Sequence, residues 1–438
     1  MRRGSLAKNV RFLEPDSLMY NSANHMNDSA SRKDCIDQGT IKTKNHIWVV
    51  LFLITGVVFI VGLLRQGLPV LYPFIQDEFG LSRTQVGLIT SSLATGSVIA
   101  VMLSGRLIDI LGPKRIITIG MLAITTFFLA FPIVDSYLLI LGLLVIIGIF
   151  SSPFSPATTK AVIDWCPIKI RASAMSITRM GIPAAGALAA AVLPALAVAF
   201  GWRIAAVGVG LLILIISVAF IFLYRDAPRD FGTTKKFDLT TFYAILRNRR
   251  LLMTMIWGFI STGFQMVVMT YFMLFLIEKL EFSSIIAGGA LALAQVISII
   301  ARVSWGTISD FVFGGRRIMV LAFSGFLTIL WMLWVSSIGE GVANITIYLI
   351  AIVMGISTLS WQGVFLASIG EQADSEQRGA TLGVTFGLVQ IGQIVVPPLF
   401  GFLVDITNSY SFGFRATAAV ALICTLALLA FGRERQHH

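Results

Sequence analysis

The stretch Gly105–Arg115, G-R-L-I-D-I-L-G-P-K-R, lies between two long apolar segments, and a similar stretch returns later in the chain as Gly306–Arg317, G-T-I-S-D-F-V-F-G-G-R-R. Each copy has an acid four residues after a glycine, where one predicted helix ends, and a further glycine and two basic residues where the next helix begins. Such a loop can hold helices together, because glycine allows close approach and the carboxylate can meet helix N-terminal amides or a basic side chain. We expect these two stretches to act as gating loops, which hold the helix ends together and release them. The residues expected to do this are Gly105, Asp109, Arg115, Gly306, Asp310 and Arg316.

The composition is that of a protein that crosses a membrane many times. Hydrophobic residues make up 56% of the chain and charged residues 13%, well below the quarter typical of soluble domains. The net charge of +11 does not indicate a nucleic-acid partner, because most basic residues fall on one side of the predicted membrane, and this bias places the N-terminus in the cytoplasm. The exceptions are Arg83, Arg203, Lys279 and Arg415 on outer segments, and Arg65, Lys160, Arg179 and Arg302 within helices.

With roughly 20 apolar residues per span, the sequence predicts twelve transmembrane helices. They lie near 47–75, 84–104, 115–134, 137–164, 172–200, 203–224, 251–279, 284–309, 316–337, 343–370, 378–405 and 412–432. The polar segment 225–250 divides them six from six, so the expected organisation is a disordered cytoplasmic tail (1–46), an N-terminal bundle (47–224), a cytoplasmic linker (225–250), a C-terminal bundle (251–432) and a short cytoplasmic tail (433–438).

The two predicted bundles repeat one another. Phe200–Arg203 before the sixth helix corresponds to Phe412–Arg415 before the twelfth, and Arg171 opening the fifth corresponds to Arg378 opening the eleventh. Two parallel repeats of this kind place a binding site at their interface near mid-membrane, with transport by rocking one repeat against the other.

The paired loops resemble the signature G-x-x-x-D-x-x-G-basic-basic of the major facilitator superfamily of secondary transporters, although Ile110 stands where a basic residue is usual. The resemblance implies an all-α fold whose first, fourth, seventh and tenth helices line the cavity. Pro153–Pro156, Ala161–Pro167 and Gly201–Arg203 resemble the anion:cation symporters and organophosphate antiporters. The spacing of Arg302, Gly306 and Asp310 is similar to that of the monocarboxylate transporters, where such an arginine binds the substrate carboxylate.

Charges inside the predicted helices are the main candidates for substrate binding, since an arginine at bilayer depth costs about 2.5–3.5 kcal/mol. Arg65 lies roughly 27 Å into the first helix, beyond reach of the cytoplasm, and is our first choice for an anion ligand, with an outer-gate or structural role as the alternative. The resemblance to the organophosphate antiporters supports this choice. Arg302 is the second choice, the alternative being a bond to Asp310 or a backbone carbonyl. For Lys160 and Arg179 we favour snorkelling or a salt bridge with Asp164.

Uncharged polar residues complete the candidate substrate site, although each could equally join one helix to another. Those expected to bind substrate are Gln66, Tyr72, Gln265, Tyr271, Trp361, Gln362, Gln390 and Gln393, and Gln295 belongs to the same polar set.

No acid lies well inside a predicted helix, and Ser151 and Ser152 occupy the stretch where many anion:cation symporters have one. Proton symport and anion exchange therefore both remain open. An exporter of drugs or metabolites from the same superfamily is the alternative function, because Gly181–Gly186 loosely resembles an exporter motif of the fifth helix.

Catalysis, metals and cofactors are not indicated. Cys35, Cys166 and Cys424 have no ligand-like spacing, and all four histidines lie outside the predicted helices. We expect a multi-pass carrier of the cell membrane, a monomer surrounded by lipid, that transports a small mono- or dicarboxylate and is not an enzyme.

Overall fold

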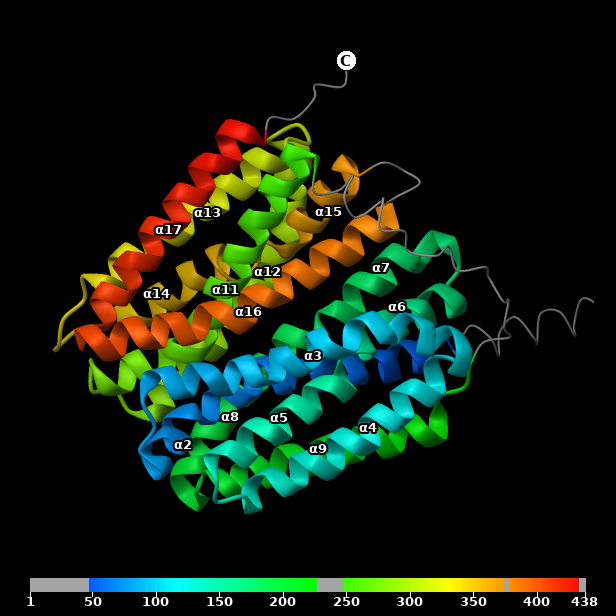
Figure 1. The fold of residues 1–438 in the computed structure, drawn as a ribbon, viewed down its shortest axis with the longest axis horizontal. Helices are drawn as coiled ribbons and strands as arrows, with labels where there is room; N and C mark the ends of the chain where they lie inside the picture. The colour runs from blue at the N-terminus through cyan, green and yellow to red at the C-terminus, as the bar shows by residue number, and fades with distance from the viewer. Residues whose placement is uncertain (1–46, 227–246, 374–377, 433–438) are drawn as a thin grey trace, which may run out of the picture. The chain divides into compact units, whose positions relative to one another are not determined.

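The computed structural model describes residues 47–226, 247–373 and 378–432, and within these ranges the chain forms helices and no strands. The expected tails (1–46 and 433–438) and most of the expected linker lie outside the described residues. Eleven helical stretches are long and apolar enough to cross a membrane, and α3, with 29 residues, completes the predicted twelve (Figure 1).

The first six spans are 47–62 with η2 (Leu63–Gly67), η3 (Leu68–Leu71) and α2 (Tyr72–Phe79); α3 (Arg83–Leu111); α4 (Pro113–Ala130) with η4 (Phe131–Ile133); α5 (Tyr137–Ser151) with α6 (Phe154–Trp165); α7 (Ile168–Arg179) with α8 (Gly181–Phe200); and α9 (Trp202–Leu223). The last six are α11 (Arg249–Glu278); α12 (Ser284–Phe311); α13 (Arg317–Ser336); α14 (Asn344–Ser357) with α15 (Gln362–Gln372); α16 (Arg378–Thr407); and α17 (Tyr410–Phe431). We call η2 to α9 the N-terminal set and α11 to α17 the C-terminal set.

Four of the predicted helices are interrupted. The first contains a π-helical turn at η2 followed by a 3-10 turn that begins next to Pro69. The fourth is interrupted between α5 and α6, where Pro153 cannot donate a backbone hydrogen bond, and the fifth is interrupted at Met180. The tenth is interrupted between α14 and α15. The predicted ranges of these four helices stand as single spans, and local turns or a proline interrupt the backbone ladder within them.

The glycines of the repeated loops are required by backbone conformation. Gly112, between α3 and α4, has φ 83°, and Gly315, between α12 and α13, has φ 79°. Residues with a Cβ rarely adopt such values, so these positions turn the chain from one helix directly into the next.

The two sets meet mainly along two helix pairs: α3 packs on α16 (Figure 1), and α8 packs on α12, while α11 also contacts α2, η3 and α3. Glycines allow this close approach, since a Cβ on Gly401 of α16 would lie 2.4 Å from the carbonyl oxygen of Arg83. A Cβ on Gly288 of α12 would lie 2.5 Å from the carbonyl oxygen of Ala190 on α8. Small residues at these contacts are what helix association within a membrane requires.

Candidate functional site

Arg65 lies on the π-helical turn η2, where the widened helix alters the direction of the side chain. Its Nη2 atom donates to Oε1 of Gln390 on α16 at 2.9 Å and to Oγ of Ser97 on α3 at 3.4 Å. The guanidinium thus lies between the two sets, and both of its acceptors are neutral.

None of the acids in the described ranges forms an ion pair with Arg65, Arg179 or Arg302. Arg83, Arg203 and Arg317, which do form ion pairs, lie at helix ends. A buried cation without a carboxylate is expensive unless something else supplies negative charge. The interior of the described part of the protein is therefore suited to binding a negatively charged ligand.

A small cavity adjoins Arg65, and residues of the first, second, seventh and eleventh helices line it. The lining residues are Leu64, Arg65, Tyr72, Thr90, Leu93, Ala94, Met266 and Gln393. Three hydroxyl groups form a hydrogen-bonded chain beside this cavity, since Thr90 Oγ1 lies 3.3 Å from Tyr72 Oη and 2.8 Å from Thr270 Oγ1. The structure thus brings four of the sequence-derived candidates together: Arg65, Tyr72, Gln390 and Gln393.

Two buried glutamine side chains approach each other beside Gly186. Gln66 is 3% exposed and Gln295 0% exposed, and the amide oxygen of each has no hydrogen-bond partner among the described residues. A Cβ on Gly186 would lie 2.9 Å from Gln66 Oε1 and 2.8 Å from Gln295 Nε2, so glycine leaves the space that both amides use. An unpaired buried carbonyl costs about 1–3 kcal/mol, which suggests a ligand or water that donates to it.

Gln265, Gln362 and Trp361 lie in the C-terminal set. Gln362 Nε2 donates to Gln265 Oε1 at 2.6 Å, which joins α15 to α11. Trp361 packs edge-to-face on Trp257, with ring centroids 5.3 Å apart, and its buried Nε1 has no partner among the described residues.

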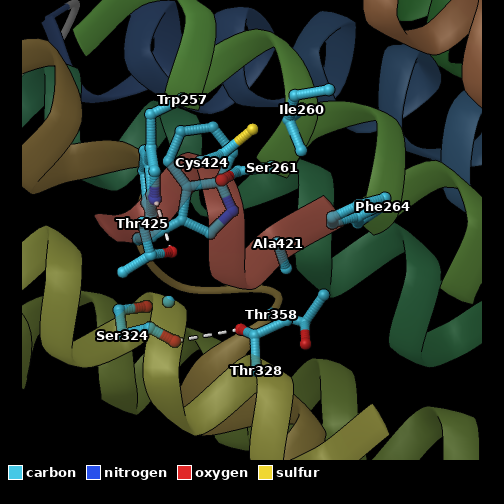
Figure 2. Close-up of a pocket in the computed structure, with 12 residues that line it drawn as sticks. Trp257, Ile260, Ser261, Phe264, Ser324, Thr328, Thr358, Ala421, Cys424 and Thr425 are labelled. Atoms are coloured by element: carbon cyan, nitrogen blue, oxygen red, sulfur yellow. Dashed lines mark hydrogen bonds between the residues drawn. The ribbon is translucent and has the colours of Figure 1, made fainter. Parts of the chain in front are cut away.

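Trp361 lines a second cavity, which shares no lining residue with the cavity beside Arg65. In Figure 2, Trp257 bonds to Thr425, with its Nε1 3.3 Å from the threonine Oγ1, and Ser324 and Thr328 lie across the cavity. Trp361 therefore belongs to the interior of the C-terminal set.

The other intramembrane cations have mostly neutral partners. Arg302 donates to the carbonyl oxygen of Leu359 at 3.0 Å, which is one form of the structural alternative considered for it, while its Nε is buried and unpaired within the described chain. Arg179 donates to Ser155 Oγ at 3.1 Å and to Thr159 Oγ1 at 3.0 Å. The expected salt bridge of Arg179 with Asp164 is therefore wrong, because hydroxyls of α6 hold the guanidinium. Lys160 lies one helical turn before Asp164 on α6, and its salt bridge with Asp164 stays a prediction.

A polar seal joins the two sets at the helix ends predicted to face outward. The carboxylate of Asp405, on α16, accepts from the backbone amides of Arg83 (3.0 Å) and Thr84 (2.8 Å) and from Thr84 Oγ1 (2.6 Å). Asp405 thus caps the N-terminus of α3 from the other set, where a negative charge is favoured by the helix dipole.

Glu278, at the end of α11, strengthens the same seal. It accepts from Arg83 Nη2 at 2.9 Å, from Gln76 Nε2 at 2.8 Å and from Tyr410 Oη at 2.9 Å. Tyr271 also lies here, donating to the carbonyl oxygens of Arg83 (2.7 Å) and Pro397 (2.9 Å). Tyr271 therefore joins helices at the seal, and the structure does not bring it beside the Arg65 cavity.

The repeated loops are only partly described. In the second copy Arg317 pairs with Asp310 and, at 3.2 Å, with Glu371, so Arg317 supplies the basic partner, and Arg316 is the residue that precedes helix α13. In the first copy the surroundings of Gly105 and of the Asp109 side chain are not among the described features, and Arg115 is exposed. The amide of Lys114 at the start of α4 donates to Asp226 at 3.0 Å.

Sequence reasoning missed Asp405, although an acid two residues before the end of an apolar helix was a usable signal. It also assigned Arg203 to the motif Gly201–Arg203, which resembles the anion:cation symporters and organophosphate antiporters. In the structure Arg203 pairs with Glu78 and with Asp135, which ties together helix ends of the N-terminal set.

Twelve apolar helical segments in two packed sets, with an uncompensated arginine between them, define a polytopic membrane carrier. Residues 54–373 match the model of the Major Facilitator Superfamily, and the chain belongs to that superfamily. It is a transporter and not an enzyme, and the resemblance stated from the loop motifs is confirmed.

The names of two curated relatives describe them as transporters of acidic sugars. The chain is 27% identical to the hexuronate transporter of Bacillus subtilis, over 89% of this chain and 96% of the relative. It is 22% identical to a probable galactarate/D-glucarate transporter of the same organism, over 87% and 91% of the two chains. Among solved structures, the nucleoside transporter NupG has a TM-score of 0.72 at 15% identity, covering 89% of this chain and 100% of NupG, which shows a shared fold.

Proposed function

We propose that this transporter carries a small organic anion, a mono- or dicarboxylate, across the cell membrane by alternating access. The observation that carries the proposal is Arg65, whose guanidinium lies between the sets with only the neutral Gln390 and Ser97 as partners. A carboxylate offers a guanidinium two charge-assisted hydrogen bonds, which neutral side chains cannot match.

The proposed anion carries hydroxyl groups. The unpaired amide oxygens of Gln66 and Gln295 can accept from hydroxyls, and Tyr72 and Thr90 offer further hydroxyl partners near Arg65. The names of the relatives, a hexuronate transporter and a probable galactarate/D-glucarate transporter, point to the same chemistry. A polar site of this kind discriminates against analogues that lack the hydroxyls, because its buried acceptors would then stay unpaired.

In the proposed cycle, the bundle 47–224 rocks against the bundle 251–432, with 225–250 as the connecting linker and both termini in the cytoplasm. The seal of Arg83, Asp405 and Glu278 is then the outer gate, closed in this structure and broken when the site opens outward. Coupling to a proton or to a second anion belongs to this proposal as two alternatives.

The alternative of a drug or metabolite exporter receives no specific support from the fifth helix. A Cβ on Gly181 would lie 3.0 Å from the carbonyl oxygen of Thr55, so close packing against the first helix explains that glycine.

A thermal-shift screen of the full-length purified protein tests the proposal. We expect hexuronates, hexarates and other hydroxylated carboxylates to raise the Tm, by mass action on the folded state. Sugar phosphates, nitrate and the corresponding neutral sugars serve as comparison ligands. Stabilisation by the neutral sugars, with no effect of their acids, would remove the assignment to organic anions.

A further inference from the structure

Four exposed arginines lie where α11 and α13 begin, at the helix ends predicted to face the cytoplasm. They are Arg247, Arg249, Arg250 and Arg316, which we call the inner arginine cluster. The backbone that carries three of them has a fixed course, because the side chain of Asn248 caps α11 and accepts from the amide of Leu251 at 3.3 Å.

The end of α17 joins the two sides of this cluster, since α17 packs on α13 (Figure 1) and also on α11. On the α11 side, Cζ of Arg249 lies 4.3 Å from the ring centroid of Phe431. On the α13 side, a Cβ on Gly432 would lie 3.4 Å from Cγ2 of Ile318, which comes two residues after Arg316. The arginines of both helices therefore lie around the end of one helix.

The charges of the inner arginine cluster are not neutralised by the described part of the chain. No acid in the described ranges forms an ion pair with any of its four members. Asp310 and Glu371, at the same helix ends, both pair with the neighbouring Arg317. The C-terminal end of α17 supplies only about half a negative charge through its helix dipole. The cluster is therefore suited to an anionic partner.

Exposed apolar side chains continue from the cluster along all three helices. On α11, Ile256 is exposed seven residues after Arg249 and thus lies on the same helix face. Phe431 is exposed at the end of α17, and Met319 and Phe323 are exposed four residues apart on α13. Such faces on membrane-spanning helices meet acyl chains, so charge and apolar surface are arranged here as they are in a phospholipid.

We propose that the inner arginine cluster binds the headgroup of an anionic phospholipid, with the acyl chains on the exposed apolar faces of α11, α13 and α17. Basic clusters between transmembrane helices recognise anionic lipid headgroups in this way. The planar guanidinium also matches a phosphate with two parallel hydrogen bonds. A zwitterionic lipid offers the same phosphate, but its own positive group would lie among four arginines. The bound lipid holds the first helix of the C-terminal set to α13 and α17, whichever substrate is carried.

The test is thermal unfolding of the delipidated full-length protein in detergent, titrated with phosphatidylglycerol or with phosphatidylcholine that has the same acyl chains. We expect phosphatidylglycerol to raise the Tm by a few degrees, and phosphatidylcholine by less than half as much, through binding to the folded state. Inorganic phosphate alone should have no effect, because it lacks the acyl chains. The response to phosphatidylglycerol should shrink in high salt, since exposed charges are screened.

Single arginine substitutions locate the site. Arg249→Gln and Arg316→Gln should each weaken the apparent affinity for phosphatidylglycerol about fivefold, the contribution of one basic residue near an anionic headgroup. Their Tm without lipid should stay within a few degrees of wild type, because both side chains are exposed. The matched control is Arg225→Gln, at an exposed arginine outside the helices at the end of the N-terminal set, and its lipid response should equal that of wild type.

Equal stabilisation by the two lipids would overturn the proposal, and so would an unchanged response in both Arg249→Gln and Arg316→Gln. An equal loss in Arg225→Gln would show general attraction to surface charge in place of a site. Stabilisation by inorganic phosphate as large as that by phosphatidylglycerol would make the ligand a free phosphate and remove the lipid. If Arg249→Gln does not fold, Arg316→Gln provides the same test from α13.

Discussion

Gly186 shows how a single missing side chain shapes a site. The absence of a Cβ lets the amides of Gln66 and Gln295 share the space beside α8, and both amide oxygens are left free to accept. Composition and spacing gave no reason to single out this glycine, since it lies in a stretch rich in small residues. Its role depends on residues from two other helices, which only the folded structure brings together.

Replacing Gly186 with alanine should impair transport more than folding. The new methyl group would meet the ends of two flexible side chains at 2.9 and 2.8 Å, so the glutamines can move away but lose their positions. We expect uptake of the transported acid to fall about tenfold, the equivalent of one lost hydrogen bond of about 1.4 kcal/mol, with a Tm within a few degrees of wild type.

The matched control is Gly208→Ala on α9, where a Cβ would have no neighbour within 4 Å. It should leave both uptake and Tm unchanged. Normal uptake by the Gly186→Ala variant would show that the paired amides do not contact the substrate.

At the scale of elements, α3 and α16 are joined by a cap that crosses from one set to the other. Asp405 accepts two backbone amides at the start of α3, and a Cβ on Gly87 of α3 would lie 2.7 Å from Pro398 Cα on α16. The interface thus combines close backbone packing with one charged cap. A cap of this kind can be released as a unit, because its acceptor oxygens all belong to one carboxylate.

Asp405→Asn should weaken the seal and shift the conformational equilibrium toward outward opening. An amide retains one acceptor oxygen but loses the charge that interacts with the helix N-terminus and Arg83, a change of about 1–2 kcal/mol or a five- to thirtyfold shift in population. Nitroxide labels at exposed Leu138 and Ala343, next to helix ends of the two sets and outside the seal, report it through a longer and broader distance distribution by pulsed electron resonance.

Asp77→Asn, at an exposed acid of α2, is the control and should leave the distribution unchanged. Identical distributions for wild type and Asp405→Asn, with and without substrate, would mean that this contact does not control the outer gate.

At the scale of the whole molecule, the sequence predicted the twelve spans and the duplicated loops, because hydrophobic length and positive-inside charge are local signals. It also singled out Arg65 as the first candidate for the site, and this role stays a prediction. It could not predict the seal, since Arg83 and Asp405 are far apart in the chain. The π-helical turn that contains Arg65 could not be predicted either, because the type of turn depends on the packing of neighbouring helices.

The charge distribution also bears on coupling. No acid in the described residues pairs with Arg65, Arg179 or Arg302, so the antiport alternative needs only a second anion to neutralise the site. We expect counterflow of labelled substrate in vesicles to continue after the pH gradient is collapsed, at a rate within about threefold of that with the gradient. Loss of exchange under these conditions would favour obligatory proton coupling.

The most direct test of the central claim is uptake of a hydroxylated carboxylate into proteoliposomes that contain wild type or Arg65→Gln, with equal amounts of folded protein. The account predicts that the Arg65→Gln variant retains its Tm to within a few degrees. Its uptake rate should fall about a hundredfold, because the charge-assisted hydrogen bonds to the substrate contribute about 2–3 kcal/mol. Uptake by Arg65→Gln at the wild-type rate would contradict it, since the anion would then be held elsewhere.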